Sequence, residues 1–163
     1  MKELLRQYAA YNVWANQKLL DLILSLPDEL QTRDLVSSFS SLYKTALHIH
    51  DAESTWWQRV KMQERISIPS ENLKGNMREL AAALVNQSKQ WEEWIKNASE
   101  LALEHVCHYQ NSKREQFKQP VFQMVLHVFN HGTYHRGQMV TMLRQMNVEK
   151  IPQTDFIIWS RKK

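Results

Sequence analysis

Residues 120–146 read PVFQMVLHVFNHGTYHRGQMVTMLRQM, and this stretch indicates the fold more clearly than any other part of the chain. Apolar and histidine side chains recur in it at the spacing of one face of an α-helix: Met124, Val128, His131, His135 and Met142. Pro120 suits the first turn of such a helix, where its missing N–H would have no partner anyway. A long helix with one apolar stripe cannot bury that stripe alone, so we expect it to pack against other helices.

Three further segments carry helical periodicity. The first runs over about residues 2–26 and is stopped by Pro27; the second follows serines at 37, 38, 40 and 41 and runs to about residue 63. The third opens near Asn76, where Asn76-Met77-Arg78-Glu79 resembles a capping box. Four amphipathic helices of about 20–27 residues favour an all-α fold, a four-helix bundle, and we expect one domain over residues 1–163.

Two other segments do not fit this pattern. Between about residues 99 and 119 apolar residues alternate with polar ones around a turn-like stretch at 110–113, which predicts a short irregular or hairpin-like excursion before the last helix. The apolar segment 151–159 should pack back on the bundle.

Glycine and proline are scarce, with 3 Gly and 4 Pro in 163 residues. Gly75, Gly132 and Gly137 are too scattered to build a P-loop or a G-x-G-x-x-G dinucleotide motif. The turn signals that an all-β sandwich or barrel needs are missing. A content of 43% hydrophobic and 10% aromatic residues excludes a disordered chain.

The formal net charge is +4, but Arg161, Lys162 and Lys163 close the chain and supply much of it. A short basic tail is not the basic surface that nucleic-acid binding requires, so we do not expect nucleic acid as a partner. A single cysteine, Cys107, cannot form an internal disulfide, which fits a reducing cytosol. We find neither an apolar run of membrane-spanning length nor a signal peptide, so we expect a cytoplasmic protein without membrane contact.

Seven histidines are present, and His127, His131 and His135 fall in one nine-residue window. A step of four residues advances only about 40° around a helix, so consecutive members share one face and can chelate one metal ion. His48 should join them from the buried side of the second helix, whereas His50 should face elsewhere. Three neutral imidazoles leave the fourth coordination position to water, as in an open, catalytically capable zinc site.

The alternative is that these histidines are hydrogen-bonded in the core or at its rim, without metal. For His127 we favour a supporting hydrogen bond to a ligand, or plain solvation, over a metal bond. Gln138, three residues after His135, is placed to hydrogen-bond a ligand imidazole or a metal-bound water. His105 and His108 lie in the irregular segment and receive no role.

Other site chemistries fit less well. A di-iron bundle needs Glu-x-x-His, which is absent, and a cysteine-rich zinc site cannot be built from one cysteine. The chain has no G-x-S-x-G nucleophile elbow. Gly132 and Gly137 weaken a helix interior, and either tight helix packing or close approach of a ligand would explain them.

Residues 130–138, Asn-His-Gly-Thr-Tyr-His-Arg-Gly-Gln, resemble the N-H-x-x-Y-H-R-G-Q signature of the DinB/YfiT-like superfamily of bacterial four-helix bundles. Leu47–Glu53 with Trp56 is similar to its second-helix motif, Tyr11–Asn16 to its first-helix opening, and Thr154–Phe156 to its closing segment. The resemblance therefore covers nearly the whole chain.

The resemblance implies that His48, His131 and His135 bind a divalent metal ion, zinc above nickel or iron, in a homodimer. Some members of the superfamily transfer a low-molecular-weight thiol to an electrophile, so the resemblance implies a metal-dependent small-molecule transferase, with such a thiol as ligand. The alternative is a non-catalytic, metal-stabilised stress-response or binding module. Catalytic residues beyond the metal ligands are not identified by these motifs.

Overall fold

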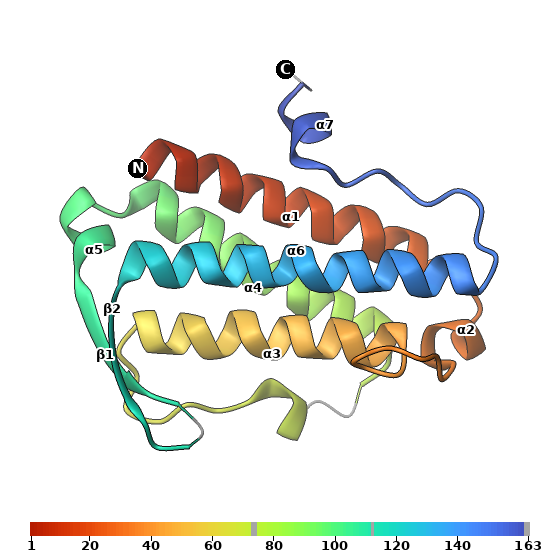
Figure 1. Cartoon of the computed structure of the whole chain (residues 1–163), viewed down its shortest axis with the longest axis horizontal. Coiled ribbons are helices and arrows are strands. Elements are labelled where there is room, and N and C mark those ends of the chain that lie inside the picture. Colours follow the sequence, from red (N-terminus) through yellow and green to blue (C-terminus); the bar gives the residue numbers. More distant parts are fainter. Residues whose placement is uncertain (73–74, 112, 162–163) are drawn as a thin grey trace.

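The computed structural model describes residues 1–72, 75–111 and 113–161 (Figure 1). Four long helices dominate it, with short elements at their ends. In chain order the elements are α1 (Lys2–Leu24), α2 (Asp28–Thr32), α3 (Leu42–Val60), the 3₁₀ turn η1 (Pro69–Glu71), α4 (Met77–Asn97), α5 (Glu100–Glu104), β1 (Val106–Gln110), β2 (Gln116–Pro120), α6 (Val121–Gln145) and α7 (Phe156–Ser160).

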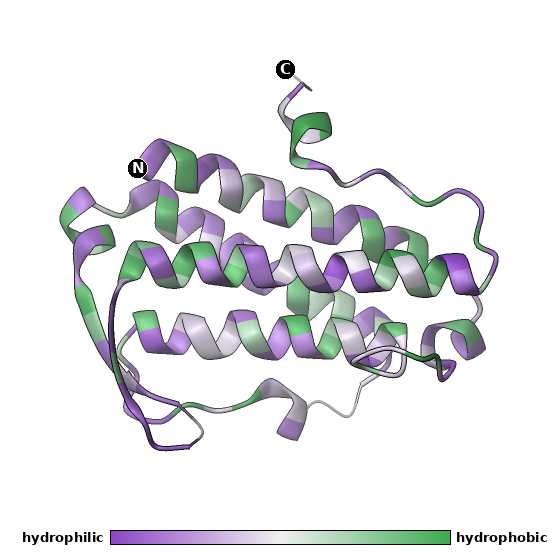
Figure 2. Cartoon of the chain, viewed as in Figure 1, coloured by the Kyte–Doolittle hydropathy of each residue, from purple (hydrophilic) through white to green (hydrophobic). Residues whose placement is uncertain are grey.

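The long helices form a four-helix bundle, which confirms the all-α fold expected from the sequence. Each of α1 and α3 packs against both α4 and α6, so the helices surround one central space in the order α1, α4, α3, α6. Helices α1 and α6 run in one direction and α3 and α4 in the other (Figure 1). Each long helix carries both hydrophobic and hydrophilic residues along its whole length, as expected for amphipathic helices with one buried face (Figure 2).

Local signals in the sequence set where the helices begin. The Ser41 hydroxyl accepts a hydrogen bond from the Lys44 N–H at the start of α3, and the Asn76 side chain accepts one from the Glu79 N–H at the start of α4. Pro120 directly precedes α6. The end of α3 was expected near residue 63 and lies at Val60, because the backbone turns into the left-handed region at Met62 (φ 51°).

Residues 99–119 contain a β-hairpin, as expected, and also a short helix that the pattern did not indicate. In the hairpin β1 pairs antiparallel with β2, and Cys107 lies opposite Gln119. Helix α5 begins at Ser99, whose hydroxyl accepts a hydrogen bond from the Ala102 N–H. An N-cap serine is visible in the sequence, so Ser99 is the signal from which α5 could have been predicted.

The C-terminal segment returns across α1, in agreement with the expected packing (Figure 1). The Tyr11 hydroxyl donates a hydrogen bond to the Thr154 carbonyl over 2.7 Å, and the Phe156 and Trp159 rings contact the Tyr11 ring edge-on. Most of the basic tail, residues 162–163, lies outside the described residues. Within the described chain no helix is long and apolar enough to cross a membrane.

The interior contains two apolar clusters separated by buried polar residues. One cluster occupies the end of the bundle near α2 and includes Leu19, Leu80 and Met142. The other occupies the hairpin end and includes Trp91, Val125 and Phe129. Between them lies a set of polar side chains that we call the polar layer: Asn12, Asn16, Glu53, Ser88 and Arg136.

Candidate metal centre

Helices α3 and α6 bring three imidazoles together halfway along the bundle. The Nε2 atom of His131 lies 3.1 Å from Nε2 of His48 and 3.0 Å from Nε2 of His135. One ring nitrogen from each residue lies within 4.8 Å of the other two. His131 and His135 lie one turn apart on α6, and His48 faces them from α3, so the helical spacing brings together the residues that it predicted.

The separations suit ligands of one ion. Two imidazole nitrogens bound at about 2.0–2.1 Å to the same zinc ion lie roughly 3.3 Å apart at tetrahedral angles and roughly 2.9 Å apart at right angles. The two Nε2–Nε2 distances of the triad, 3.0 and 3.1 Å, lie within this range. Imidazole nitrogen suits zinc, nickel, copper and iron rather than calcium or magnesium, so this donor set fits a divalent transition metal ion.

Burial keeps the three imidazoles ready to coordinate. It is the largest influence on the pKa values of His48, His131 and His135 and lowers all three. The pKa of His131 falls to about 4, since the neighbouring imidazoles also oppose its protonation. The rings are therefore neutral at neutral pH, and a metal ion would not compete with protons for their lone pairs.

Gln138 fixes the orientation of one imidazole of the triad. The Nδ1–H of His135 donates to Oε1 of Gln138 over 2.8 Å, and Nε2 of Gln138 donates in turn to the Ser38 hydroxyl over 3.0 Å. A proton held on Nδ1 leaves the lone pair of His135 on Nε2, the atom that faces the other two histidines. This is the contact expected of Gln138 from its spacing.

His127 lies beside the triad without joining it. Its ring centroid is 5.7 Å from that of His131 and 5.0 Å from that of Trp56. In the described part of the chain we find no hydrogen bond from His127 to a triad histidine. The supporting hydrogen bond proposed for His127 therefore has no counterpart in this geometry, and its contact with Trp56 is an aromatic one.

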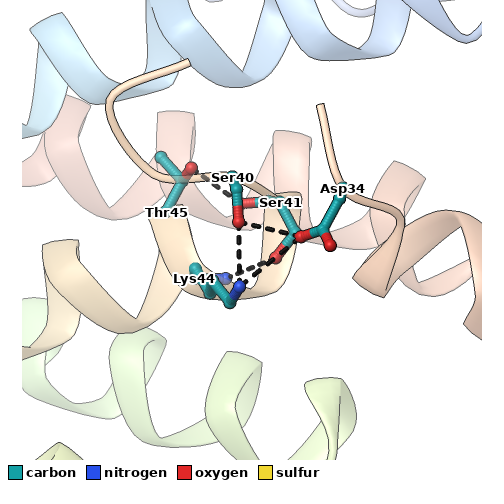
Figure 3. Close-up of polar contacts among 5 residues, drawn as sticks. All are labelled: Asp34, Ser40, Ser41, Lys44 and Thr45. Atoms are coloured by element: carbon teal, nitrogen blue, oxygen red, sulfur yellow. Dashed lines mark hydrogen bonds and ion pairs between the residues drawn. The ribbon is translucent and has the colours of Figure 1, made fainter. Parts of the chain in front are cut away.

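The loop before α3 supplies a wall that sequence reasoning missed. The Phe39 ring stacks on His48 with centroids 4.1 Å apart and meets His135 edge-on at 5.6 Å. The loop is held by the Ser40 hydroxyl, which donates to Asp34 over 2.9 Å and accepts from the Lys44 ammonium over 2.8 Å (Figure 3). The Ser40 hydrogen bond, aided by Lys44, lowers the pKa of Asp34. Helical periodicity carries no information about a loop residue such as Phe39.

Of the two histidines of α3, the one predicted to lie outside the site is the more deeply buried. His50 stays outside the triad, as predicted, but it is the more buried of the two, with 8% of its surface exposed and no partner for Nδ1. His48 is half-buried, at the rim where α3 meets α6. His105 and His108 are exposed on and beside the hairpin, away from the triad.

The two glycines of α6 differ in their surroundings. A Cβ on Gly132 would lie 3.1 Å from an Arg136 guanidinium nitrogen and 3.3 Å from the Asn12 side-chain oxygen, so Gly132 leaves space for the polar layer. A Cβ on Gly137 would meet nothing within 4 Å. The packing explanation therefore holds for Gly132 and is wrong for Gly137.

The polar layer was not anticipated, and it lies next to the metal centre. Glu53, five residues after His48, accepts hydrogen bonds from Asn12, Asn16 and Ser88 over 2.8–3.1 Å. Arg136, adjacent to His135, donates to the oxygens of the same two asparagines over 2.8 and 2.9 Å. Burial raises the pKa of Glu53 and lowers that of Arg136, and the asparagines connect the two groups.

Comparisons of the sequence and of the fold with known proteins all identify DinB or DinB-like proteins. The model of the DinB family matches residues 1–160. The chain is 27% identical over 154 residues to a protein named Protein DinB from Bacillus subtilis (strain 168), covering 90% of this chain and 87% of that one. A solved DinB-like protein from Bacillus cereus ATCC 10987 has a similar fold, with a TM-score of 0.68 and 19% identity over 88% of this chain and 91% of that one.

Proposed function

The chain belongs to the DinB family, and from that premise we propose that it binds one divalent metal ion through His48, His131 and His135. The observation that carries the proposal is the convergence of three neutral Nε2 atoms at 3.0 and 3.1 Å from two helices. Zinc is the preferred ion, because it accepts three imidazoles and an exchangeable ligand without a geometric preference of its own. Nickel and iron are the alternatives.

We further propose that the centre acts on a small molecule, and that the reaction is transfer of a low-molecular-weight thiol to an electrophile. When bound, the metal would lower the pKa of a thiol so that it is a thiolate at neutral pH. The thiol proton would pass to solvent, a sulfur–carbon bond would form, and the leaving group of the electrophile would depart with the electron pair of the broken bond.

The chain's own residues support such a reaction by positioning and by excluding water. Gln138 holds the His135 ring in place, and the Phe39 ring covers one face of the His48 ring. His135 is buried, whereas His48 and His131 are half-buried, so a small molecule would reach the triad on the side of His48 and His131.

The second candidate is a non-catalytic module in which the metal stabilises the fold. It is favoured by the position of the triad, because one ion would cross-link α3 to α6 beside the polar layer. This candidate predicts that chelation lowers the melting temperature, whereas neither a thiol nor an electrophile raises it. A homodimer remains a prediction from the resemblance, and sedimentation equilibrium would test it.

The first experiment is metal analysis of protein purified without a histidine tag. We expect one equivalent of metal per chain, loss of that metal in His48→Ala, and no loss in His108→Ala, which removes an exposed histidine of the hairpin. Unchanged stoichiometry in His48→Ala would refute the triad. The second experiment is turnover of 1-chloro-2,4-dinitrobenzene with cysteine as thiol, with and without chelator. A rate that chelation does not change would refute metal-dependent transfer.

A further inference from the structure

A row of aromatic rings leads from the metal centre along the bundle to the hairpin. From His131 the ring centroids follow one another at 5.7 Å to His127, 5.0 Å to Trp56 and 5.2 Å to Tyr109. Phe117 on β2 stacks on Tyr109 at 5.7 Å and is 40% exposed. These rings come from α3, α6 and both strands, and we call them the aromatic row.

Arg59 lies at the hairpin end of this row. Its guanidinium carbon is 4.5 Å from the centre of the Trp56 ring and 4.9 Å from that of Tyr109, so the cation stacks against two rings. One guanidinium nitrogen donates to the backbone carbonyl of Gln110 over 3.3 Å. These contacts fix the position of the charge without neutralising it.

Arg59 lacks an acidic partner in the described part of the chain, and its Nε is buried with no hydrogen-bond partner. A half-buried guanidinium is normally paired with a carboxylate, since burial without a partner is costly. Glu64 lines the same surface cavity as Arg59 but makes no ion pair with it. The cavity has a volume of about 740 Å³ and lies at the hairpin, where Tyr109 and Gln110 also line it, so a ligand carboxylate has room beside the guanidinium. Trp56 and the triad do not line this cavity.

The distance from Arg59 to the triad defines the length of a ligand that could use both. Along α3, His48 and Trp56 are eight residues apart, or roughly 12 Å at 1.5 Å per residue. The Arg59 side chain extends back toward the N-terminus of α3, as helical side chains do, and its guanidinium lies over Trp56. A molecule about 12 Å long could therefore contact both the triad and Arg59.

We propose that the aromatic row and Arg59 form the binding surface for an elongated small organic carboxylate, whose carboxylate pairs with Arg59 and whose other end reaches the triad. The aromatic row supplies ring edges and faces for the apolar middle of the ligand, and Arg59 supplies a fixed cation for its end. Only the contact at the triad rests on the proposed metal-binding function. The contact between the ligand carboxylate and Arg59 is inferred from the positions of Arg59, Trp56 and Tyr109 alone.

The test uses three rigid probes that differ only at their ends. 4′-Mercaptobiphenyl-4-carboxylate carries a thiol and a carboxylate, biphenyl-4-carboxylate lacks the thiol, and 4-mercaptobiphenyl lacks the carboxylate. Dissociation constants are measured by calorimetry on zinc-loaded and chelated protein. The variants are Arg59→Met, which keeps an apolar chain over Trp56, Arg59→Lys, which keeps a charge, and Arg33→Met, which removes an exposed arginine near α2 as a matched control.

We expect Arg59→Met to weaken both carboxylated probes by about tenfold or more, the loss typical of a charge-assisted hydrogen bond, and to leave 4-mercaptobiphenyl within about twofold. Arg59→Lys should recover part of the affinity, and Arg33→Met should change nothing. Circular dichroism and melting curves establish that each variant is folded.

Two results would overturn the proposal at the carboxylate end: equal affinity of the carboxylated probes for wild type and Arg59→Met, or no saturable binding of biphenyl-4-carboxylate. A third result would overturn it at the triad. If chelation leaves the affinity of the thiol probes unchanged while Arg59→Met still weakens the carboxylates, the ligand does not reach a metal ion. Metal analysis of the same zinc-loaded sample distinguishes the two failures. If one zinc ion per chain is bound, the result counts only against the reach of the ligand, whereas absence of the ion counts against the proposed function.

Discussion

Replacing Arg136 by methionine removes the positive charge of the polar layer while keeping an unbranched apolar side chain of similar length. Arg136 is 2% exposed and donates to the side-chain oxygens of Asn12 and Asn16. Both asparagines are buried, with 0% and 2% of their surface exposed, so water cannot replace the lost donors. Glu53 loses the neighbouring cation in the same substitution.

The expected cost follows from these contacts. Each buried acceptor left without a donor costs about 1–3 kcal/mol, and two are created. Removing one partner of a buried charged pair typically costs about 3–5 kcal/mol. We therefore expect Arg136→Met to lower the free energy of unfolding by about 3–5 kcal/mol. Adding Glu53→Gln should reduce that loss, because the double variant no longer buries an uncompensated carboxylate.

Equilibrium unfolding in urea, on metal-stripped protein so that metal binding does not contribute, measures this loss. Arg144→Met, an exposed position two turns further along α6, is the matched control and should change stability by less than about 0.5 kcal/mol. A loss below about 1 kcal/mol for Arg136→Met would refute the reasoning. Additive losses in the double variant would show that Glu53 and Arg136 are not coupled.

Three further predictions concern α6. Gln138→Ala should weaken metal affinity by about 10–100-fold in competition with a chromophoric chelator, because it frees the Nδ1–H of His135, and an unchanged affinity would contradict this role. In metal-stripped protein the free energy of unfolding should fall as the pH drops from 6.5 toward 4. In this range His131 binds a proton in the unfolded chain but not in the folded protein, where its pKa is about 4. Urea titrations at several pH values measure this, and a free energy of unfolding that does not change over this range would contradict it. Gly137→Ala should stabilise the helix by about 0.5–1 kcal/mol, since its Cβ meets nothing, whereas Gly132→Ala should destabilise it, since its Cβ would lie 3.1 Å from a guanidinium nitrogen; thermal melts showing the reverse order would contradict the packing described.

Much of the bundle could be predicted because its signals are local. Capping residues and prolines act within one helical turn, so Ser41, Asn76 and Pro120 indicated where three of the long helices begin. The pairing of His131 with His135 is likewise fixed by the helix itself. The addition of His48 needed only the expectation that α3 and α6 present one face each to the same interior.

The remainder depends on contacts between helices, which periodicity does not specify. The spacing places His48 and His50 about 200° apart, but which of them is more buried depends on how α3 is rotated against its neighbours. Glu53 and Arg136 are charged residues on helix faces that are otherwise apolar. Only the assembled bundle shows that two asparagines of α1 connect them. Phe39 lies in a loop, where no repeat relates sequence to direction.

The polar layer also fixes how the four helices are aligned along the bundle axis. Two apolar surfaces can slide past one another at modest cost, but moving α3 by one turn, about 5.4 Å, would place Glu53 against the apolar cluster at either end and strip it of its donors. Only one axial alignment of the four helices keeps the layer intact. His48 and the α6 histidines lie within about two turns of that layer, so they are aligned by the same constraint. The accuracy with which the three nitrogens meet is thus determined in the core, by residues outside the triad.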